Sequence, residues 1–432
     1  MKKLSFKEPR FFQKLERFAA DSSDRAELQA TVSGILEDVR RRGDKAIVEY
    51  TEHFDGFRSS AAALRVKREQ LEAAKDSLEP RQRRAIREAI RCVRNFHKKG
   101  LPTDWTARNP QGAMVGERWY PVERVGIYIP AGNVPLVSTA VMTITLAKLA
   151  KVPSIAVFTP ANSEGQVSRQ MLAGLALCGV DEVYRVGGAQ AVAAMAFGTR
   201  TIPAVNKVMG PGNAFVAEAQ RQVFGQVGVD LLPGPSEALA IADSTAKPAY
   251  IAADLMAQAE HGSGKERIYY IYTSKKQAAA VEKALHEQLP GLSHREAIAG
   301  ILASRTCFIH VPSLKAAVEV AKFVAPEHLE LHVESGVAKK LVKEIHTAGA
   351  ILCGHDTPTV LGDFTAGPSH TLPTARTGRF FSGLKITDFM RRSSLVQYDR
   401  KSLTAAREVV RVFSELEQLD AHGKSLEIRF KD

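Results

Sequence analysis

The sequence predicts an α/β protein with two parallel β-sheet regions, and three observations lead to this fold class. Short apolar runs with strand character alternate with segments of helical periodicity from residue 122 to about residue 380. Glycine- and proline-rich turns separate many of these runs from the helices that follow. This alternation is typical of a parallel, doubly wound sheet. At 432 residues the chain is also too long for a single hydrophobic core, so two or more domains are expected.

The first hundred residues are expected to be mostly helical, without a strong strand. Apolar residues at helical spacing run through residues 32–39, and Ser23 or Asp24 is a candidate N-cap for that helix. The helical pattern resumes over residues 46–54 after an interruption at Gly43. Residues 1–24 are assigned to an N-terminal arm that precedes these helices.

Two series of strands and helices follow. The first gives strands at residues 124–130, 154–159, 182–186 and 207–209, with helices at 141–149, 171–177, 191–196 and after 213. The second gives strands at 238–242, 267–272, 307–311, 329–333 and 348–353, with helices at 250–260, from 275 and at 314–324. Beyond residue 373 the pattern loosens, and a helix over 403–417 precedes the tail. Polar motifs fall in the loops between strands and helices, where open α/β sheets bind ligands.

Composition argues against membrane and secreted classes. No apolar run reaches the roughly 18 to 20 residues of a membrane span. The basic N-terminus is not followed by an apolar segment, so no secretory signal is expected. Four cysteines without a CxxC pair indicate a reducing compartment and no disulfide framework. We therefore expect a cytoplasmic protein without a membrane partner.

The net charge of +12 has its densest basic run at residues 81–99. One helical face there carries Arg84, Arg87, Arg91, Arg94 and Lys98. Such a face suits a nucleic-acid surface or the solvated side of an amphipathic helix. The second interpretation is favoured, because no nucleic-acid motif or aromatic stacking set accompanies the run, and no nucleic-acid partner is expected.

Several polar residues are candidate metal ligands. Gln258 and His261 lie three residues apart at the end of a predicted helix, although the histidine could instead cap that helix beside Gly262. Asp363 and His370 lie in a loop of glycine and proline residues at 362–373, where an aspartate often forms an Asx turn. His422 is ambiguous by itself.

The pair Glu327–His328 stands where a loop is expected to enter a strand, so both side chains could line one cleft. A histidine with an ordinary pKa of about 6.5 is a general base at neutral pH, and the neighbouring carboxylate could activate water. The alternative is an ordinary polar loop end.

Four glycine-rich turns, at 130–133, 187–190, 210–213 and 234–237, precede predicted helices or polar loops. Backbone amides at such turns can bind phosphate, so a nucleotide ligand is a reasonable expectation. None of the turns matches the GxGxxG fingerprint of dinucleotide-binding proteins.

In their order and spacing these motifs resemble the histidinol dehydrogenase family, and the resemblance covers nearly the whole chain. The segments that carry it are 125–130, 187–190, 210–213, 234–237, 258–261, 326–329, 362–363 and 369–373, and the tail with Glu417 and His422. The resemblance implies oxidation of L-histidinol, through the aldehyde, to L-histidine, the last step of histidine biosynthesis. It also implies two NAD+ per turnover, one zinc ion (Zn2+) per subunit, and a homodimer with swapped terminal segments.

Carried over to matching positions, the resemblance implies roles for particular residues. The implied zinc ligands are Gln258, His261, Asp363 and His422. The implied substrate contacts are Ser236, His328, His370 and Glu417, together with the four metal ligands. The implied NAD contacts are Tyr128, Gln190 and Asn213. Glu327 and His328 would be the acid/base pair, and Glu417 and His422 would complete the partner's active site. A metal site of nitrogen and oxygen ligands is typical of catalytic or substrate-binding zinc, and all four cysteines are interpreted as structural.

The predicted organisation comprises an arm (1–24), a first domain with the zinc and catalytic motifs (25–121 and 237–381), a second, NAD-binding domain (122–236) and a dimer-swapped tail (382–432). The fold class is thus α/β, two Rossmann-like parallel-sheet domains with a helical N-terminal arm and a C-terminal tail. Pro233 and residues 353–358 differ from the residues usual at these positions in the family, and these differences are expected to affect how the substrate fits. Two alternatives stay open: oxidation of another small alcohol or diol, and nucleic-acid binding without catalysis.

Overall fold

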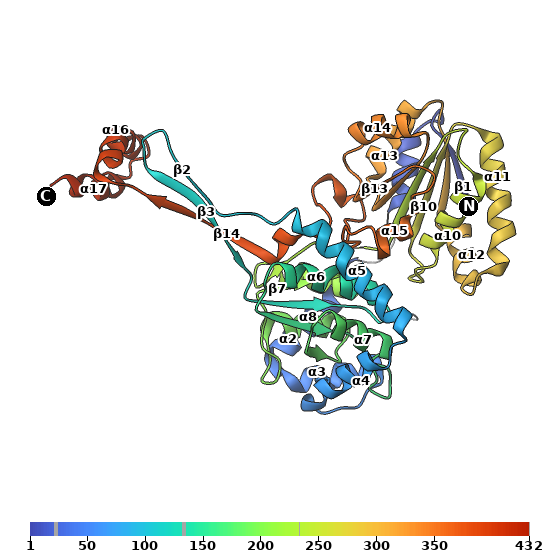
Figure 1. Cartoon of the computed structure of the whole chain (residues 1–432), viewed down its shortest axis with the longest axis horizontal. Helices are drawn as coiled ribbons and strands as arrows, with labels where there is room; N and C mark the ends of the chain where they lie inside the picture. Colours follow the sequence, from blue (N-terminus) through green and yellow to red (C-terminus); the bar gives the residue numbers. More distant parts are fainter. Residues whose placement is uncertain (21–24, 132–134, 233, 432) are drawn as a thin grey trace. The chain divides into compact units, whose positions relative to one another are not determined.

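The computed structural model describes residues 1–20, 25–131, 135–232 and 234–431. These residues form two compact units, the first of residues 1–100 and 122–389 and the second of 101–121 and 390–432. The first unit contains two parallel sheets with helices on their faces, so the predicted α/β fold class is confirmed (Figure 1). The candidate caps Ser23 and Asp24, part of the turn at 130–135, and Pro233 lie outside the described residues.

A six-stranded sheet in the first unit has the order β1-β11-β10-β9-β12-β13, and its neighbouring strands are all parallel. The strands are β1 (Lys2–Ser5), β9 (Glu237–Ala242), β10 (Arg267–Tyr272), β11 (Thr306–His310), β12 (His328–His332) and β13 (Ala350–Cys353). One face shares a core with helices α10 (Pro248–Ala259), α11 (Lys275–Gln288) and α12 (Arg295–Ser304). The other face shares a core with α1 (Phe11–Ala19), α13 (Leu314–Val324) and α14 (Ser335–Glu344). Because both faces are covered, β9, β10 and β11 are largely apolar, whereas β12 alternates polar and apolar residues.

A five-stranded parallel sheet in the same unit has the order β6-β5-β4-β7-β8. Its strands are β4 (Arg124–Tyr128), β5 (Ser154–Phe158), β6 (Glu182–Tyr184), β7 (Lys207–Met209) and β8 (Gly228–Val229). The helices that connect them are α6 (Val137–Leu149), α7 (Arg169–Leu177), α8 (Gly188–Phe197) and α9 (Ala214–Val223). All four are rich in alanine or other apolar residues, which suits helices buried against a sheet.

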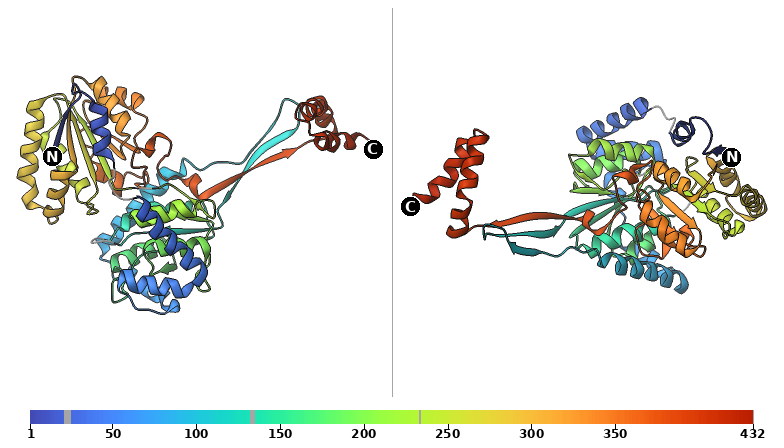
Figure 2. Two further views of the ribbon diagram at one scale, coloured as in Figure 1. Left: turned by 180° about the vertical axis from the view of Figure 1, so that it is seen from behind. Right: turned by 90° about the horizontal axis from the view of Figure 1, so that it is seen from above.

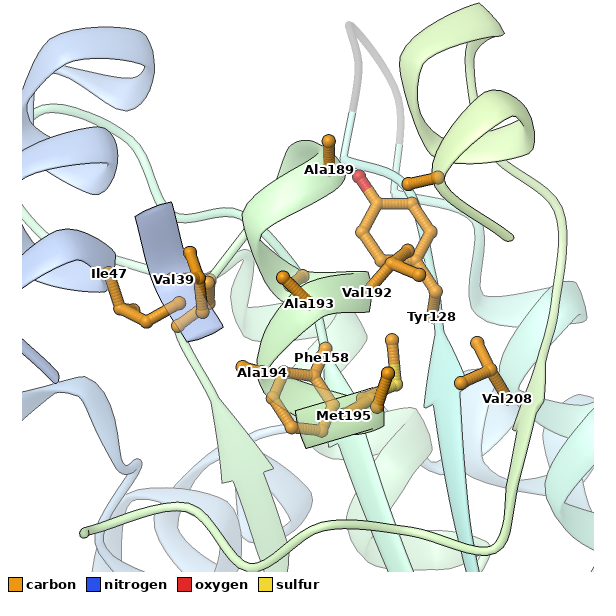
Figure 3. Packing of buried hydrophobic residues seen from close by; sticks show 14 of the residues in the cluster. Val39, Ile47, Tyr128, Phe158, Ala189, Val192, Ala193, Ala194, Met195 and Val208 are labelled. Carbon is orange, nitrogen blue, oxygen red and sulfur yellow. The ribbon is translucent and has the colours of Figure 1, made fainter. Parts of the chain in front are cut away.

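The N-terminal helices pack with the elements of this second sheet: the first two contribute to its hydrophobic cluster, and the last two contact α7 and α6. They are α2 (Arg25–Arg42), α3 (Asp44–Asp55), α4 (Arg68–Asp76) and α5 (Pro80–Lys98), with a 3-10 turn η1 (Ala61–Leu64). Val39 and Ile47 share one hydrophobic cluster with Phe158, Ala193 and Ala194 (Figure 3). The prediction grouped residues 25–121 with 237–381, but in the hydrophobic core residues 25–98 go with residues 122–236, and 105–121 belong to the second unit. The arginine-rich face of α5 is exposed while Val93 and His97 are buried, as the amphipathic interpretation expects.

The first hundred residues, expected to be mostly helical without a strong strand, contain one short edge strand at the N-terminus. Residues 2–5 form β1, which pairs in parallel with β11 at the edge of the six-stranded sheet and lies there in both Figure 1 and Figure 2. Only Leu4 of this strand is buried, so four residues with three polar side chains gave no recognisable pattern. A short helix α15 (Thr359–Phe364) and the 3-10 turns η2 (Leu289–Gly291), η3 (Thr377–Arg379) and η4 (Ile386–Phe389) complete the first unit.

The second unit is an antiparallel sheet followed by two helices. Strands β2 (Trp105–Arg108), β3 (Met114–Pro121) and β14 (Met390–Gln397) pair in the order β14-β3-β2. Helices α16 (Arg400–Leu416) and α17 (Asp420–Glu427) and the turn η5 (Ile428–Phe430) follow. The three strands were not predicted, because their residues are mostly exposed or half-buried and lack the apolar runs of the parallel strands. The helix predicted at 403–417 corresponds to α16.

Candidate active site

The candidate active site forms around the first residue of β12. Glu327 precedes the strand and is buried, and its Oε2 accepts a hydrogen bond of 2.9 Å from the backbone N–H of Glu237, which begins the neighbouring strand β9. Burial raises the pKa of Glu327 well above its ordinary value, against the lowering effect of that hydrogen bond. A carboxyl group with a raised pKa is suited to carry a proton between water and a reacting group.

His328 lies beside Glu327 and is almost fully buried. Its Nδ1 is 3.7 Å from Glu327 Oε2 and makes no hydrogen bond with any described residue, and its Nε2 is 3.9 Å from Asp363 Oδ1. Burial, followed by the nearby charge of His261, lowers the pKa of His328 to about 3. The imidazole is therefore neutral and has a lone pair available for a proton.

Asp363 and His370 extend this cluster. Asp363 Oδ1 lies 3.8 Å from His370 Nδ1, and His370 Nε2 lies 3.3 Å from Thr139 Oγ1 on α6. Burial raises the pKa of Asp363 to about 6, and it lowers the pKa of His370 to about 4 with help from the charge of His261. Residues 359–364 form helix α15, so Asp363 lies on a helix instead of in the predicted loop.

Gln258 and His261 approach the cluster from the end of α10. His261 lies two residues beyond the helix, and its Nδ1 is 3.1 Å from the backbone oxygen of Gln258. The helix-capping alternative is thus realised at this nitrogen. A carbonyl oxygen only accepts hydrogen bonds, so Nδ1 carries a proton, and Nε2 is the nitrogen left for a metal ion.

The amide group of Gln258 shows the strongest sign of a ligand. Both its Oε1 and its Nε2 are buried and have no hydrogen-bond partner among the described residues. A buried polar group without a partner costs about 1 to 3 kcal/mol, so its persistence indicates that something else binds it. With an imidazole and a carboxylate nearby, this donor set of nitrogen and oxygen atoms fits a zinc ion.

The remaining predicted substrate residues are less closely defined. Ser236 precedes β9, is half-buried, and accepts a hydrogen bond from the Arg267 N–H through its backbone oxygen at 3.0 Å. Glu417 and His422 are exposed and belong to the second unit, at the end of α16 and within α17. The first unit by itself therefore brings together six predicted site residues: Gln258, His261, Glu327, His328, Asp363 and His370.

The predicted NAD residues follow the carboxyl ends of strands in the five-stranded sheet. Tyr128 ends β4, and its hydroxyl oxygen accepts a hydrogen bond of 3.2 Å from the N–H of Gly188 at the start of α8, toward which it points in Figure 3. Gly188 has a φ of 63°, and a Cβ there would come within 2.6 Å of Gln190 Oε1. Both polar atoms of the Gln190 side chain are buried without a hydrogen-bond partner in the described structure. These groups are available to a polar ligand.

Asn213 has a structural role of its own. It is the N-cap of α9, where its Oδ1 accepts hydrogen bonds of 3.1 Å from the N–H groups of both Phe215 and Val216. A capping asparagine fixes the first turn of the helix and needs no ligand to explain it. Its NAD contact stays a prediction.

Several polar residues near these sites were not identified from the sequence. Glu237 is buried beside Arg267 at 3.6 Å, and burial raises the pKa of Glu237 to about 7. Asp254, Glu330 and His332 form a buried cluster whose ligand-type atoms lie within 4.8 Å of one another. In the sequence, Glu330 and His332 alternate with leucines, and polar residues at every second position of a buried strand are the signal that could have revealed them.

Comparisons with known proteins agree on one family. The family model for histidinol dehydrogenase matches residues 19–430. Histidinol dehydrogenases from Aromatoleum aromaticum and Nitrosospira multiformis are each 40% identical over the whole of this chain, covering 98% and 97% of those proteins. The crystal structure of histidinol dehydrogenase from Elizabethkingia anophelis matches with a TM-score of 0.93 and 30% identity, covering 100% of this chain and 98% of that one. The chain therefore belongs to the histidinol dehydrogenase family of oxidoreductases.

Proposed function

We propose that this protein oxidises L-histidinol to L-histidine in two successive NAD-dependent steps, with L-histidinaldehyde as the intermediate, and that it needs one zinc ion per subunit. The observation that carries the proposal is the cluster around the start of β12, where the buried Glu327 and His328 lie beside the half-buried Asp363 and His370. The exposed His261 and the buried, unpartnered amide of Gln258 approach it from the end of α10. Family membership supplies the substrate class. This would be the last step of histidine biosynthesis.

Zinc would be held by Gln258, His261 and Asp363, with His422 as a fourth ligand. The side-chain atoms required are the amide oxygen of Gln258, which has no other described partner, the Nε2 of His261 and a carboxylate oxygen of Asp363. When bound, zinc would anchor the imidazole and amine nitrogens of the substrate and neutralise the negative charge of the site. His370 and Ser236 would contact the substrate beside it.

His328 would act as the general base of the first oxidation. It would accept the hydroxyl proton of histidinol while the hydride leaves the adjacent carbon for NAD+, which gives the aldehyde, NADH and one proton. The Nδ1 atom of His328, which has no hydrogen-bond partner among the described residues, is free to accept that proton. Glu327 would then take a proton from water as the water adds to the aldehyde carbon. The resulting hydrate would give its hydride to a second NAD+ and lose one hydroxyl proton, which leaves the carboxylic acid, NADH and one proton.

NAD+ would bind at the carboxyl edge of the five-stranded sheet, in contact with Tyr128, Gln190 and Asn213. Open α/β sheets bind nucleotides at this edge, and the unpartnered amide of Gln190 supports the assignment. The close approach of chain segments there depends on glycine. A Cβ at Gly210, whose φ is 101°, would meet the backbone oxygen of Tyr128 at 2.2 Å.

The protein would work as a homodimer with swapped terminal segments, in which Glu417 and His422 enter the partner's site and Glu417 meets the substrate amine. Exposed apolar side chains support a partner for the second unit. They are Val409, Val412, Phe413, Leu416, Leu419 and Ile428, with Leu416 72% and Phe413 57% exposed. Such a concentration on two adjoining helices is typical of a subunit interface.

A cytoplasmic location agrees with the cysteines, since Cys92, Cys178, Cys307 and Cys353 are all unpaired. Among the described helices, none has the length and apolar character needed to cross a bilayer.

The proposed reaction is tested by incubating purified protein with L-histidinol and NAD+ and identifying the product by chromatography. We expect L-histidine, no product after a strong chelator has removed the metal, and recovery after Zn2+ is added. Turnover by metal-free protein would refute the zinc role. Equal turnover of unrelated small alcohols, unaffected by Glu417→Gln, would favour the alternative substrate class.

The swapped arrangement is tested by mixing two inactive variants, His328→Asn and His422→Ala, under conditions that exchange subunits. If the tail completes the partner's site, each mixed dimer has one intact site, and activity returns to about a quarter of the wild-type value for random pairing. A mixture that stays inactive although the chains exchange would refute the swap.

A further inference from the structure

The buried cluster of Asp254, Glu330 and His332 lies outside the residues that the proposed reaction uses. His332 Nε2 is 3.3 Å from Asp254 Oδ2 and 3.3 Å from Glu330 Oε2. All three residues are at least nine-tenths buried. Glu330 Oε1 in turn accepts hydrogen bonds from the Oγ1 and, at 3.3 Å, the N–H of Thr359.

These residues join three elements that also supply the candidate site. Residues at every second position of a strand share a face, so His328, Glu330 and His332 line one face of β12. Their partners in register on β9 are Ala238, Ala240 and Ala242, which belong to the core shared with α10. Small alanines leave room there for the larger polar side chains and for the helix.

In both α10 and α15, the residue that contacts the buried cluster lies four residues before a proposed zinc ligand. Asp254 lies four residues before Gln258 on α10, and Thr359 lies four residues before Asp363 on α15. Residues four apart occupy the same face of a helix one turn away. The contact of His332 with Asp254 therefore fixes α10 one turn from Gln258, and the contact of Glu330 with Thr359 fixes α15 one turn from Asp363.

We propose that the Asp254–His332–Glu330–Thr359 chain is a positioning device that holds Gln258 and Asp363 at the spacing zinc requires. This inference rests on the proposed function. The four residues do not touch the reacting atoms, and they act through the helices that carry the ligands. Outer partners of this kind commonly change metal affinity by about 10- to 100-fold when they are altered.

The same cluster could instead be a second cation site, since a histidine and two carboxylates converge in it. The electrostatic environment of His332 favours a proton on its imidazole over a bound metal ion. Burial opposes the charge on His332, but the hydrogen bonds that His332 donates to Asp254 and Glu330 outweigh it and raise the pKa of His332 to about 9. An imidazolium between two carboxylates already balances much of their charge, and a metal would have to displace its proton.

The test measures equilibrium Zn2+ affinity by competition with a chromophoric chelator, and counts the metal bound per subunit. Thr359→Val, Glu330→Gln and Asp254→Asn are each expected to weaken Zn2+ binding about 10- to 100-fold with one ion per subunit still bound at saturation. Thr359→Ser, which keeps the hydroxyl, is expected to restore wild-type affinity. The valine variant preserves shape, so it reports on the contact even if a charge variant fails to fold.

The matched control is Glu182→Gln, which breaks a half-buried ion pair with Arg124 in the other sheet. It is expected to lower stability without changing Zn2+ affinity. Equal effects of Glu182→Gln and Thr359→Val, or no effect of Thr359→Val, would overturn the positioning role. Two ions per wild-type subunit, one of them lost in Asp254→Asn, would overturn it in favour of a second cation site. Failure of the wild-type protein to bind Zn2+ would instead refute the proposed function.

Discussion

The two parallel sheets of the first unit use opposite edges for polar groups. In the five-stranded sheet, the candidate NAD residues follow the carboxyl ends of β4, β6 and β7, where open α/β sheets bind nucleotides. In the six-stranded sheet, Glu327 and His328 stand at the amino end of β12, beside the start of β9. The first edge offers backbone amides and the uncharged side chains of Tyr128, Gln190 and Asn213, with two carboxyl groups of raised pKa behind them, Asp55 and Asp230. The second offers a cluster of carboxyl groups and imidazoles.

This difference follows from what each edge can provide. Carboxyl edges are followed by helix N-termini, whose free N–H groups suit phosphates without any charged side chain. The amino edge of the six-stranded sheet receives the end of α10 and the beginning of β12, so side chains of distant segments converge there. Burial then moves their pKa values in opposite directions, up for Glu327 and Asp363 and down for His328 and His370. Groups tuned in this way can exchange protons with a substrate.

The largest expected effect comes from the acid/base pair at the amino edge. Glu327→Gln is expected to slow oxidation of the aldehyde about 10²- to 10⁴-fold, because the amide cannot take a proton from water. The first hydride transfer should be affected less, so rapid mixing should show one NADH formed quickly and a second formed slowly. Glu319→Gln, an exposed change on α13, is the control. Two equally fast hydride transfers in Glu327→Gln would remove this residue from the mechanism.

Replacing a zinc ligand should weaken zinc binding at the amino edge of the six-stranded sheet and leave NAD+ binding at the carboxyl edge of the five-stranded sheet unchanged. His261→Asn is expected to reduce Zn2+ affinity by about 100-fold or more, beyond the effect of altering an outer partner, and to leave the Kd for NAD+ unchanged. Chelator competition and fluorescence titration measure the two quantities. Unchanged Zn2+ affinity in this variant would show that the metal binds elsewhere.

The matching substitution at the carboxyl edge of the five-stranded sheet should weaken NAD+ binding and leave zinc binding unchanged. Gln190→Ala is expected to raise the Kd for NAD+ about tenfold, the effect of losing one or two neutral hydrogen bonds, and to leave Zn2+ affinity unchanged. The same titrations measure it. If NAD+ binding is unaffected, the unpartnered amide of Gln190 has another function.

The smallest expected effect concerns stability at the carboxyl edge. Burial raises the pKa of Asp55, which lies next to Gly187, to about 6. The folded protein therefore binds more protons at this carboxyl than the unfolded chain between pH 4 and 6, and its stability falls as pH rises through that window. Asp55→Asn removes the charged form and is expected to stabilise the protein at pH 7 by about 1 to 2 kcal/mol, after allowance for partial exposure. Denaturation midpoints at pH 5 and pH 7 should show a larger gain at pH 7, and an equal gain at both would contradict the assignment.

The sequence predicted the parallel strands and their helices well, because buried strands contain apolar and aromatic runs such as residues 268–272. It did not predict β2, β3 and β14, which are mostly exposed and of which β14 pairs with a strand far away in the chain. Its grouping of residues 25–98 with residues 237–381 differs from the packing, because α2 and α3 share a hydrophobic cluster with the five-stranded sheet. Amphipathic helices reveal which side is apolar but do not reveal which of two sheets that side will cover.

For the site, motifs and family resemblance identified the residues that the structure brings together around His328. They did not identify Asp254, Glu330 or His332, because the sequence around a charged residue in an apolar helix or strand does not show which distant residue it pairs with. The sequence also did not predict that the cluster around His328 lies at the amino edge of its sheet, because open α/β sheets generally bind ligands at the carboxyl edge.

We propose that one cluster of residues carries the substrate through both oxidations and that the aldehyde stays bound between them. This proposal is tested most directly by adding a limiting, known amount of L-histidinol to zinc-loaded protein with excess NAD+ and counting the NADH formed. Two NADH per histidinol, with no aldehyde trapped by an added carbonyl reagent, is the expected result. One NADH per histidinol with free aldehyde, or none, would contradict it.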